Sequence, residues 1–108
     1  YSNDAKTRIL GVSEETLKRY GAVSPETARE MARGMRNLAG STFGLSLTGI
    51  AGPEGGTDEK PVGLVYLGMA TAGGEETREL RLLGGRDGIR TLAAKTALDW
   101  LRRTLERE

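Results

Sequence analysis

The sequence predicts a layered α/β/α domain with a mixed sheet, and three features lead to this expectation. Segments with helix starts and helical apolar spacing occupy the N-terminal part. Three segments typical of strands follow, and a long amphipathic helix closes the chain. Because three strands are few for two helical layers, we expect a further strand before Tyr1. Residues 1–108 would then be a single domain that is incomplete at its N-terminus.

Two short helices are predicted at the start of the chain. Polar residues open the segment Ser2–Leu10, and Gly11 ends it. In the segment Ser13–Tyr20, a serine precedes two glutamates, which is the pattern of an N-cap with acidic residues in the first turn. Gly21 then provides a stop.

A longer helix is predicted from Ser24 to Gly40. Ser24 can cap it, and Pro25 occupies the first helical position, where a missing N–H breaks no hydrogen bond. Apolar residues recur at helical spacing up to the glycine. They are Ala28, Met31, Ala32, Met35, Leu38 and Ala39.

The apolar pattern then changes to that of strands. Phe43–Thr48 alternates, and Val62–Ala70 is almost continuously apolar, as expected of a strand buried on both faces. Ala72–Glu75 predicts a turn, and Thr77–Leu83 alternates again. We therefore expect an antiparallel hairpin between the last two strands.

A long amphipathic helix is predicted after the glycine-rich break at Gly84–Gly88. One stripe of it is apolar and consists of Ile89, Leu92, Ala93, Ala97, Trp100, Leu101 and Leu105. Trp100 lies within this stripe, so we assign it to the core.

The composition excludes several classes of chemistry. The chain has no cysteine and no histidine, so it holds no disulfide, no Cys nucleophile and no Ser-His-Asp triad. Acid–base chemistry would fall to Lys, Tyr, Asp or Glu. The net charge is +1 with acids and bases interleaved, which gives no reason to expect nucleic acid or a membrane surface as a partner.

The most informative segment is the glycine-rich stretch Thr48–Gly63, which joins two predicted strands. Long loops in small domains are usually functional. Glycines permit positive φ and close backbone approach, so successive N–H groups can surround an anion. The stretch matches neither the P-loop nor the Gly-x-Gly-x-x-Gly pattern. From these residues alone, a ligand-binding loop and a mobile surface loop are equally good interpretations.

Two further segments have side chains that could act on a ligand. Tyr1 and Lys6 lie about one and a half helical turns apart, so a desolvated lysine could act as a base with tyrosine as proton relay. Arg86 and Arg90 begin the last helix, where exposed N–H groups and guanidinium groups could bind phosphate. On spacing alone, solvated charge beside an ordinary helix start is favoured for both.

Several of these segments match the motifs of one family. Tyr1–Val12 resembles a Tyr-Ser-Asn-Glu-Ala-Lys-x-x-Leu-Leu-Gly-Val segment, and Gly21–Glu26 resembles a Gly-Ala-Val-Ser helix start. The central signature is matched at Thr48–Pro53, Gly55–Thr57 and Lys60–Gly63. Gly85-Arg86-Asp87 is similar to Gly-Asp-Arg with its last two residues exchanged. Over its whole length the chain thus resembles the CinA C-terminal domain family, the nicotinamide-nucleotide amidase group.

The resemblance implies a cytoplasmic amidohydrolase that removes ammonia from nicotinamide mononucleotide and leaves nicotinate mononucleotide. Such domains use a serine nucleophile and a lysine base, with no metal and no cofactor. The family's serine lies in a Ser-Cys-Thr-Gly-Gly motif before the Tyr-Ser-Asn segment. This sequence does not contain that motif, and Ser2 does not match its position. We therefore expect these 108 residues alone to be inactive; the alternative is a non-catalytic nucleotide-binding or interaction module.

By matched position, the resemblance gives catalytic roles to three residues. Lys6 would be the base, and Tyr1 would orient or relay the proton. Thr48 would place its hydroxyl in the pocket and bond the substrate or Lys6. The Lys6 amine and the Thr48 hydroxyl should then lie within hydrogen-bond reach or one water apart.

The resemblance gives substrate-binding roles to glycines and arginines. Backbone approach to the substrate would occur at Gly49, Gly52, Gly55 and Gly56, and the stretch from 49 to 56 would form one wall. Arg86 would contact the phosphate, with Arg90 as a substitute. We expect a homo-oligomer, in which a neighbouring subunit can supply the arginine-bearing helix end.

Overall fold

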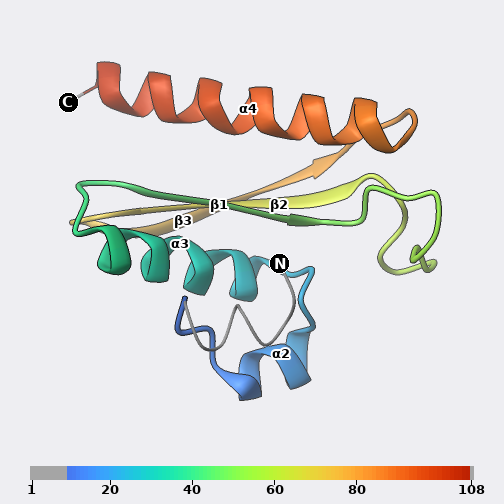
Figure 1. Ribbon diagram of the computed structural model, residues 1–108, viewed down its shortest axis with the longest axis horizontal. Helices are drawn as coiled ribbons and strands as arrows, with labels where there is room; N and C mark the ends of the chain where they lie inside the picture. Colours follow the sequence, from blue (N-terminus) through green and yellow to red (C-terminus); the bar gives the residue numbers. More distant parts are fainter. Residues whose placement is uncertain (1–9, 108) are drawn as a thin grey trace.

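The computed structural model describes residues 10–107, which fold into three layers (Figure 1). Helix α4 covers one face of a three-stranded sheet, α3 covers the other, and α2 packs beside α3. The elements in chain order are α2 (Glu14–Tyr20), α3 (Pro25–Ala39), β1 (Gly44–Gly49), β2 (Leu64–Thr71), β3 (Gly74–Arg81) and α4 (Arg86–Glu106). The predicted α/β/α layering is confirmed. The helix expected at Ser2–Leu10 lies outside the described residues, which begin at Leu10.

The sheet has the order β1-β2-β3, and both pairs of strands are antiparallel. The expectation of a mixed sheet is therefore wrong for residues 10–107. The reason lies in the connections, since parallel neighbours need a long crossover, usually a helix. A tight turn joins β2 to β3, and the loop 50–63 joins β1 to β2 without a helix. The predicted hairpin is confirmed, although β3 begins at Gly74 and not at Thr77.

The helix starts and stops expected from the sequence are present. Ser13 Oγ accepts a hydrogen bond from Thr16 N at 3.0 Å, and Ser24 Oγ accepts one from Thr27 N at 3.1 Å. Each bond satisfies an N–H group of the first helical turn. At the other end of α3, Gly40 takes the left-handed conformation with φ of 62° and closes the helix.

Small residues let α3 lie close against the sheet. A Cβ atom at Gly68 would stand 2.3 Å from the carbonyl oxygen of Ala28, so β2 has no room for a side chain there. Ser46 Oγ of β1 donates a hydrogen bond to the same carbonyl at 2.6 Å. These contacts fix the start of α3 relative to the end of β1, where the candidate site lies.

The main hydrophobic core lies between the sheet and α4. Val65, Leu67 and Met69 of β2 pack against four residues of α4, which are Ile89, Ala93, Ala97 and Trp100. Trp100 is 2% exposed, as predicted, and the Arg78 guanidinium lies 4.4 Å from the centroid of its ring. The predicted stripe was too wide, because Leu92 and Leu105 flank this line of contact and are about half exposed.

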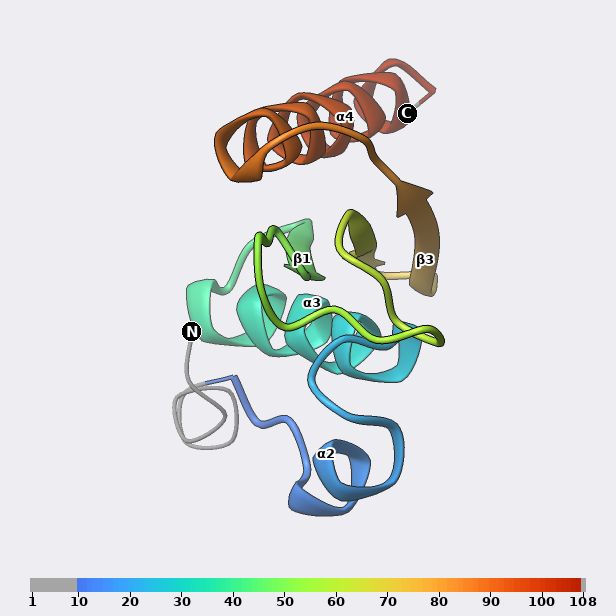
Figure 2. The same ribbon diagram turned by 90° about the vertical axis from the view of Figure 1, so that its right-hand side faces the viewer.

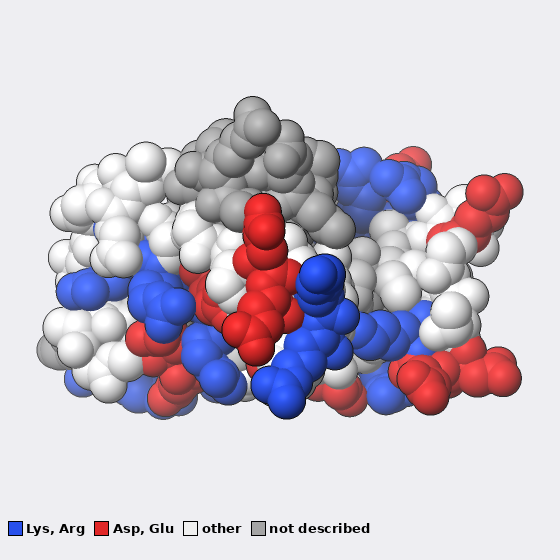
Figure 3. Space-filling view, turned by 90° about the horizontal axis from the view of Figure 1, so that it is seen from below, with Lys and Arg blue, Asp and Glu red and all other residues white. Residues whose placement is uncertain are grey.

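The opposite surface of the molecule is formed by α2 and α3. Acidic and basic side chains are interspersed on it (Figure 3). One pair joins the layers, since Arg33 Nη1 of α3 lies 3.3 Å from Glu75 Oε1 of β3. Within residues 10–107, no helix combines the length and the apolar composition needed to cross a membrane.

Candidate ligand-binding site

The candidate site lies at one end of the sheet, where several elements converge. Strand β1 ends there, α3 and α4 begin there, and the loop 50–63 runs across this end of the molecule (Figures 1 and 2). Strand ends and helix starts that meet at one place present backbone groups and side chains to the same volume. The topology therefore places the glycine-rich loop beside the arginines that open α4.

The loop 50–63 is closed by backbone hydrogen bonds at its base. Ile50 N donates to Leu64 O at 3.0 Å, and Gly63 N donates to Ile50 O at 2.7 Å. Near its far end, Thr57 N donates to Lys60 O at 2.9 Å. Lys60 N returns a bond to Thr57 Oγ1 at 3.0 Å. Hydrogen bonds thus hold the loop together at its base and at a tight turn between Thr57 and Lys60.

Two of the loop glycines make room for a side chain of the loop itself. A Cβ atom at Gly52 would stand 2.6 Å from Val62 Cγ1, and one at Gly56 would stand 2.9 Å from Val62 Cγ2. Gly52 also has a φ of 80°, a left-handed backbone conformation that favours glycine. The peptide bond between Gly52 and Pro53 is cis. These glycines therefore serve the packing of the loop.

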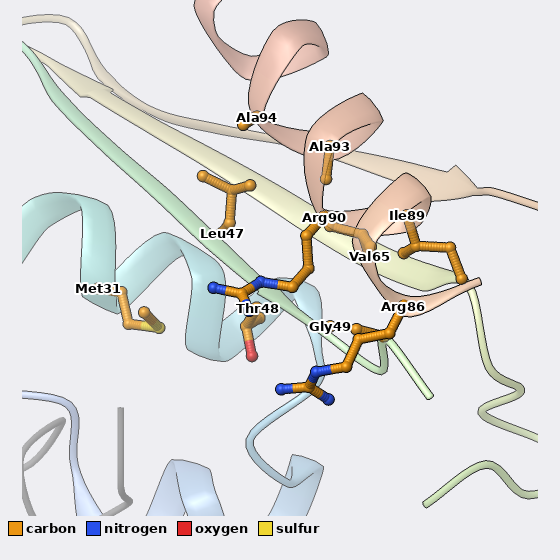
Figure 4. Close-up of a pocket in the computed structure, with 11 residues that line it drawn as sticks. Met31, Leu47, Thr48, Gly49, Val65, Arg86, Ile89, Arg90, Ala93 and Ala94 are labelled. Carbon is orange, nitrogen blue, oxygen red and sulfur yellow. The ribbon is translucent and has the colours of Figure 1, made fainter. Parts of the chain in front are cut away.

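A pocket of about 530 Å³ opens between β1 and the start of α4 (Figure 4). Thr48 and Gly49 line it from β1, and the Arg86 and Arg90 side chains extend toward them from α4. The remaining lining residues are apolar: Met31, Leu47, Ala51, Val65, Ile89, Ala93 and Ala94. Among the described lining residues two are arginines and none is acidic, so the pocket suits an anionic ligand.

The two arginines differ in their contacts. Arg86 Nη1 donates to Gly52 O at 3.0 Å and so links α4 to the loop. No hydrogen bond of Arg90 is found among residues 10–107, and Figure 4 shows its guanidinium beside Thr48. The N-cap of α4 is Gly85, which provides no side-chain cap for the first N–H groups. The helix start therefore adds positive potential to that of the two side chains.

Thr48 has a partner that the sequence did not indicate. Its hydroxyl, on a residue only 7% exposed, donates to Ala22 O at 2.6 Å. The expected partners were the substrate or Lys6. Because its proton is donated to this carbonyl, the Thr48 oxygen can act toward any other group only as an acceptor. Ala22 lies 26 positions away, in the link between α2 and α3, and nothing in local sequence marks this pairing.

The structure brings only some of the predicted site residues together. Thr48, Gly49, Arg86 and Arg90 line the same pocket, and Gly52 contributes its carbonyl to Arg86. The predicted wall is shorter than expected, because Gly55 and Gly56 do not line the pocket and Ala51 does. Tyr1 and Lys6 lie outside the described residues, so their predicted approach to Thr48 stays a prediction.

Removing the Thr48 hydroxyl should destabilise this end of the molecule. In Thr48→Val the side chain keeps its shape, but Ala22 O loses its donor. We expect the free energy of unfolding to fall by about 1–3 kcal/mol, the usual cost of a buried polar group left without its partner. Urea denaturation measures this, with Thr48→Ser as the control that keeps the hydroxyl. Equal stability of the parent and the valine variant would show that the bond contributes nothing.

The chain is similar in sequence to proteins of one family. Residues 1–105 match the family model described as "CinA C-terminal domain". A CinA-like protein of Syntrophomonas wolfei is 58% identical over 106 residues, which are 98% of this chain and 26% of that protein. A CinA-like protein of Geobacter sulfurreducens is 56% identical over 105 residues, or 97% of this chain and 25% of that protein. The chain thus spans about a quarter of the length of these relatives.

Solved structures show the same arrangement of elements. The competence/damage inducible protein CihA from Agrobacterium tumefaciens superposes with a TM-score of 0.91 at 46% identity, over 95% of this chain and 64% of that one. The competence damage-inducible protein A (ComA) from Klebsiella pneumoniae gives 0.92 at 35% identity, over 98% of this chain and 66% of that one. The elements that build the pocket are therefore part of a shared fold.

Proposed function

The chain belongs to the CinA C-terminal domain family, and on that premise we propose that its pocket binds nicotinamide mononucleotide for deamidation to nicotinate mononucleotide. The chain spans about a quarter of the length of its curated relatives, so the proposal concerns only the part of those proteins that the chain matches. The observation that supports it best is the placement of Arg86 and Arg90 over Thr48 and Gly49 in one pocket.

The pocket has the size and chemistry that such a ligand requires. Its volume of about 530 Å³ lies in the range of small-molecule sites. Guanidinium groups bind phosphate through paired hydrogen bonds, so Arg90 and the remaining N–H groups of Arg86 are placed to hold the 5′-phosphate. The apolar side chains of Leu47, Val65 and Ile89 offer a surface for the planar pyridine ring.

Amide hydrolysis also requires a nucleophile and a base. We propose that Lys6 takes the proton of the family's serine while the serine oxygen attacks the carboxamide carbon. Tyr1 would orient or relay that proton to the departing ammonia, and water would then release the carboxylate. The Ser-Cys-Thr-Gly-Gly motif that carries the serine is not among these 108 residues.

The residues described around the pocket favour binding without turnover by this chain alone. Thr48 carries the only hydroxyl among the described lining residues, and it donates its proton to a carbonyl and not to a base. It is therefore poorly placed to act as a nucleophile. This supports the second candidate, a nucleotide-binding module, for the 108 residues taken by themselves.

Ammonia release distinguishes the two candidates. Full-length protein should convert nicotinamide mononucleotide to equimolar ammonia and nicotinate mononucleotide, while the 108-residue chain should give no ammonia above buffer. Chromatography of the nucleotides confirms the product. Clear turnover by the 108-residue chain would assign the nucleophile to Ser2 or a threonine, and no turnover by the full-length protein would contradict the amidohydrolase.

We further propose that the protein works in the cytoplasm, where its nucleotide substrate would be available, and that it is a homo-oligomer. Strand β1 is an edge of the described sheet and borders the pocket, so a neighbouring subunit could help to complete the site. No nucleic-acid or membrane partner is proposed.

A further inference from the structure

Three successive carbonyl groups, from the last residue of α2 into the link before α3, each accept a hydrogen bond from a side chain. Tyr20 O accepts from Lys60 Nζ of the glycine-rich loop at 2.6 Å. Gly21 O accepts from the hydroxyls of Ser24 and Thr27 at 3.0 and 2.7 Å. Ala22 O accepts from Thr48 Oγ1 of the pocket at 2.6 Å, as described above. This short segment is thus bonded to the loop, the start of α3 and the end of β1.

The Lys60 ammonium group lies at the C-terminus of α2, where a cation is favoured. Tyr20 is the last residue of α2, and the carbonyl groups of a helix C-terminus carry partial negative charge that favours a cation. Gly21 has a φ of 81°, and a Cβ atom there would stand 3.0 Å from Lys60 Nζ. The glycine therefore leaves room for the ammonium group to reach the helix end.

A series of contacts leads from this lysine to the pocket. The Lys60 backbone closes the turn with Thr57, and Val62 fills the space left by Gly52 and Gly56. Gly52 O in turn accepts from Arg86, which lines the pocket. Lys60 itself does not line the pocket. A shift of the turn would displace the carbonyl that holds Arg86.

We propose that Lys60 is a positioning residue that anchors the glycine-rich loop to the end of α2 and so keeps Arg86 at the pocket. Its effect on ligand affinity rests on the proposed nucleotide site. Its effect on the loop does not, because the contacts that fix the loop are made without a ligand.

The test compares three variants of the full-length protein. Lys60→Met keeps the length of the side chain but removes its charge and donors. Lys60→Arg keeps a cation that can reach Tyr20 O. Lys18→Met removes one exposed lysine from α2 as the matched control. Amide hydrogen exchange over residues 51–62 and titration with nicotinamide mononucleotide are measured for each.

We expect Lys60→Met to speed exchange in residues 51–62 by about tenfold and to weaken nucleotide binding severalfold, because a hydrogen bond to a charged group is lost. Lys60→Arg should stay near the parent in both, and Lys18→Met should match the parent. Loop exchange in Lys60→Met equal to that in Lys18→Met overturns the proposal. An equal rise across α3 and α4 also overturns it, since Lys60 would then only stabilise the fold. If the parent binds no nucleotide, the proposed function fails, and loop exchange still decides the role of Lys60.

Discussion

Lys6→Ala in the full-length protein should lower the turnover of nicotinamide mononucleotide by about 10²–10⁴-fold and leave the fold intact, because general-base catalysis contributes an acceleration of this order. The assignment of Lys6 comes from its matched position in the family motif. The charged residues described in the pocket lining are Arg86 and Arg90, and a guanidinium group has donors but no acceptor for the proton of a nucleophile. No histidine exists in the chain to replace the lysine.

Steady-state ammonia release measures the turnover of Lys6→Ala. Titration with the nucleotide and thermal unfolding of the same variant show whether binding or folding has changed as well. Lys18→Ala is the matched control, since Lys18 is an exposed lysine of α2 that lies outside the matched segments Tyr1–Val12 and Gly21–Glu26. Turnover in Lys6→Ala within a factor of a few of the parent would eliminate the Ser–Lys mechanism. A lost fold in Lys6→Ala would give Lys6 a structural role instead.

Local signals in the sequence were sufficient to predict α2, α3 and α4. Ser13 and Ser24 cap α2 and α3 as expected, and Gly40 ends α3, because capping depends on residues three or four positions apart. The layered arrangement followed from the order of these elements. The relative direction of β1 and β2 could not be predicted in this way, because it depends on how the connection between two strands crosses the sheet. An irregular loop joins these two strands, and they pair antiparallel.

The family resemblance implied that Thr48 and the arginines of α4 act on one ligand, and these residues line one pocket. That this pocket is the functional site stays a prediction, and its contacts were not predicted. The bonds from Thr48 to Ala22 and from Arg86 to Gly52 join residues 26 and 34 positions apart. Hydrogen bonds between residues so far apart in the sequence form only when the helices pack against the sheet, so local sequence does not indicate them. Lys60 belonged to the matched signature, yet its contact with Tyr20 O was visible only in the structure.

If the arginines of α4 bind the phosphate of a nucleotide, as we propose, replacing both should remove most of the nucleotide affinity. Hydrogen bonds to charged groups contribute about 1.5–3 kcal/mol each. The variant Arg86→Met, Arg90→Met should therefore bind nicotinamide mononucleotide about 10²–10⁴-fold more weakly than the parent does. Nicotinamide riboside has the same ring and sugar without the phosphate, so it serves as the matched ligand.

The most direct measurement is calorimetric titration of the full-length protein and this double variant with both ligands. The parent should bind the nucleotide about 10²–10⁴-fold more tightly than the riboside, and the double variant should bind the two ligands alike, with the riboside affinity unchanged. If the parent binds nucleotide and riboside equally, or if the double variant keeps the full preference for the nucleotide, the arginines of α4 do not bind the phosphate and the account of this pocket is wrong.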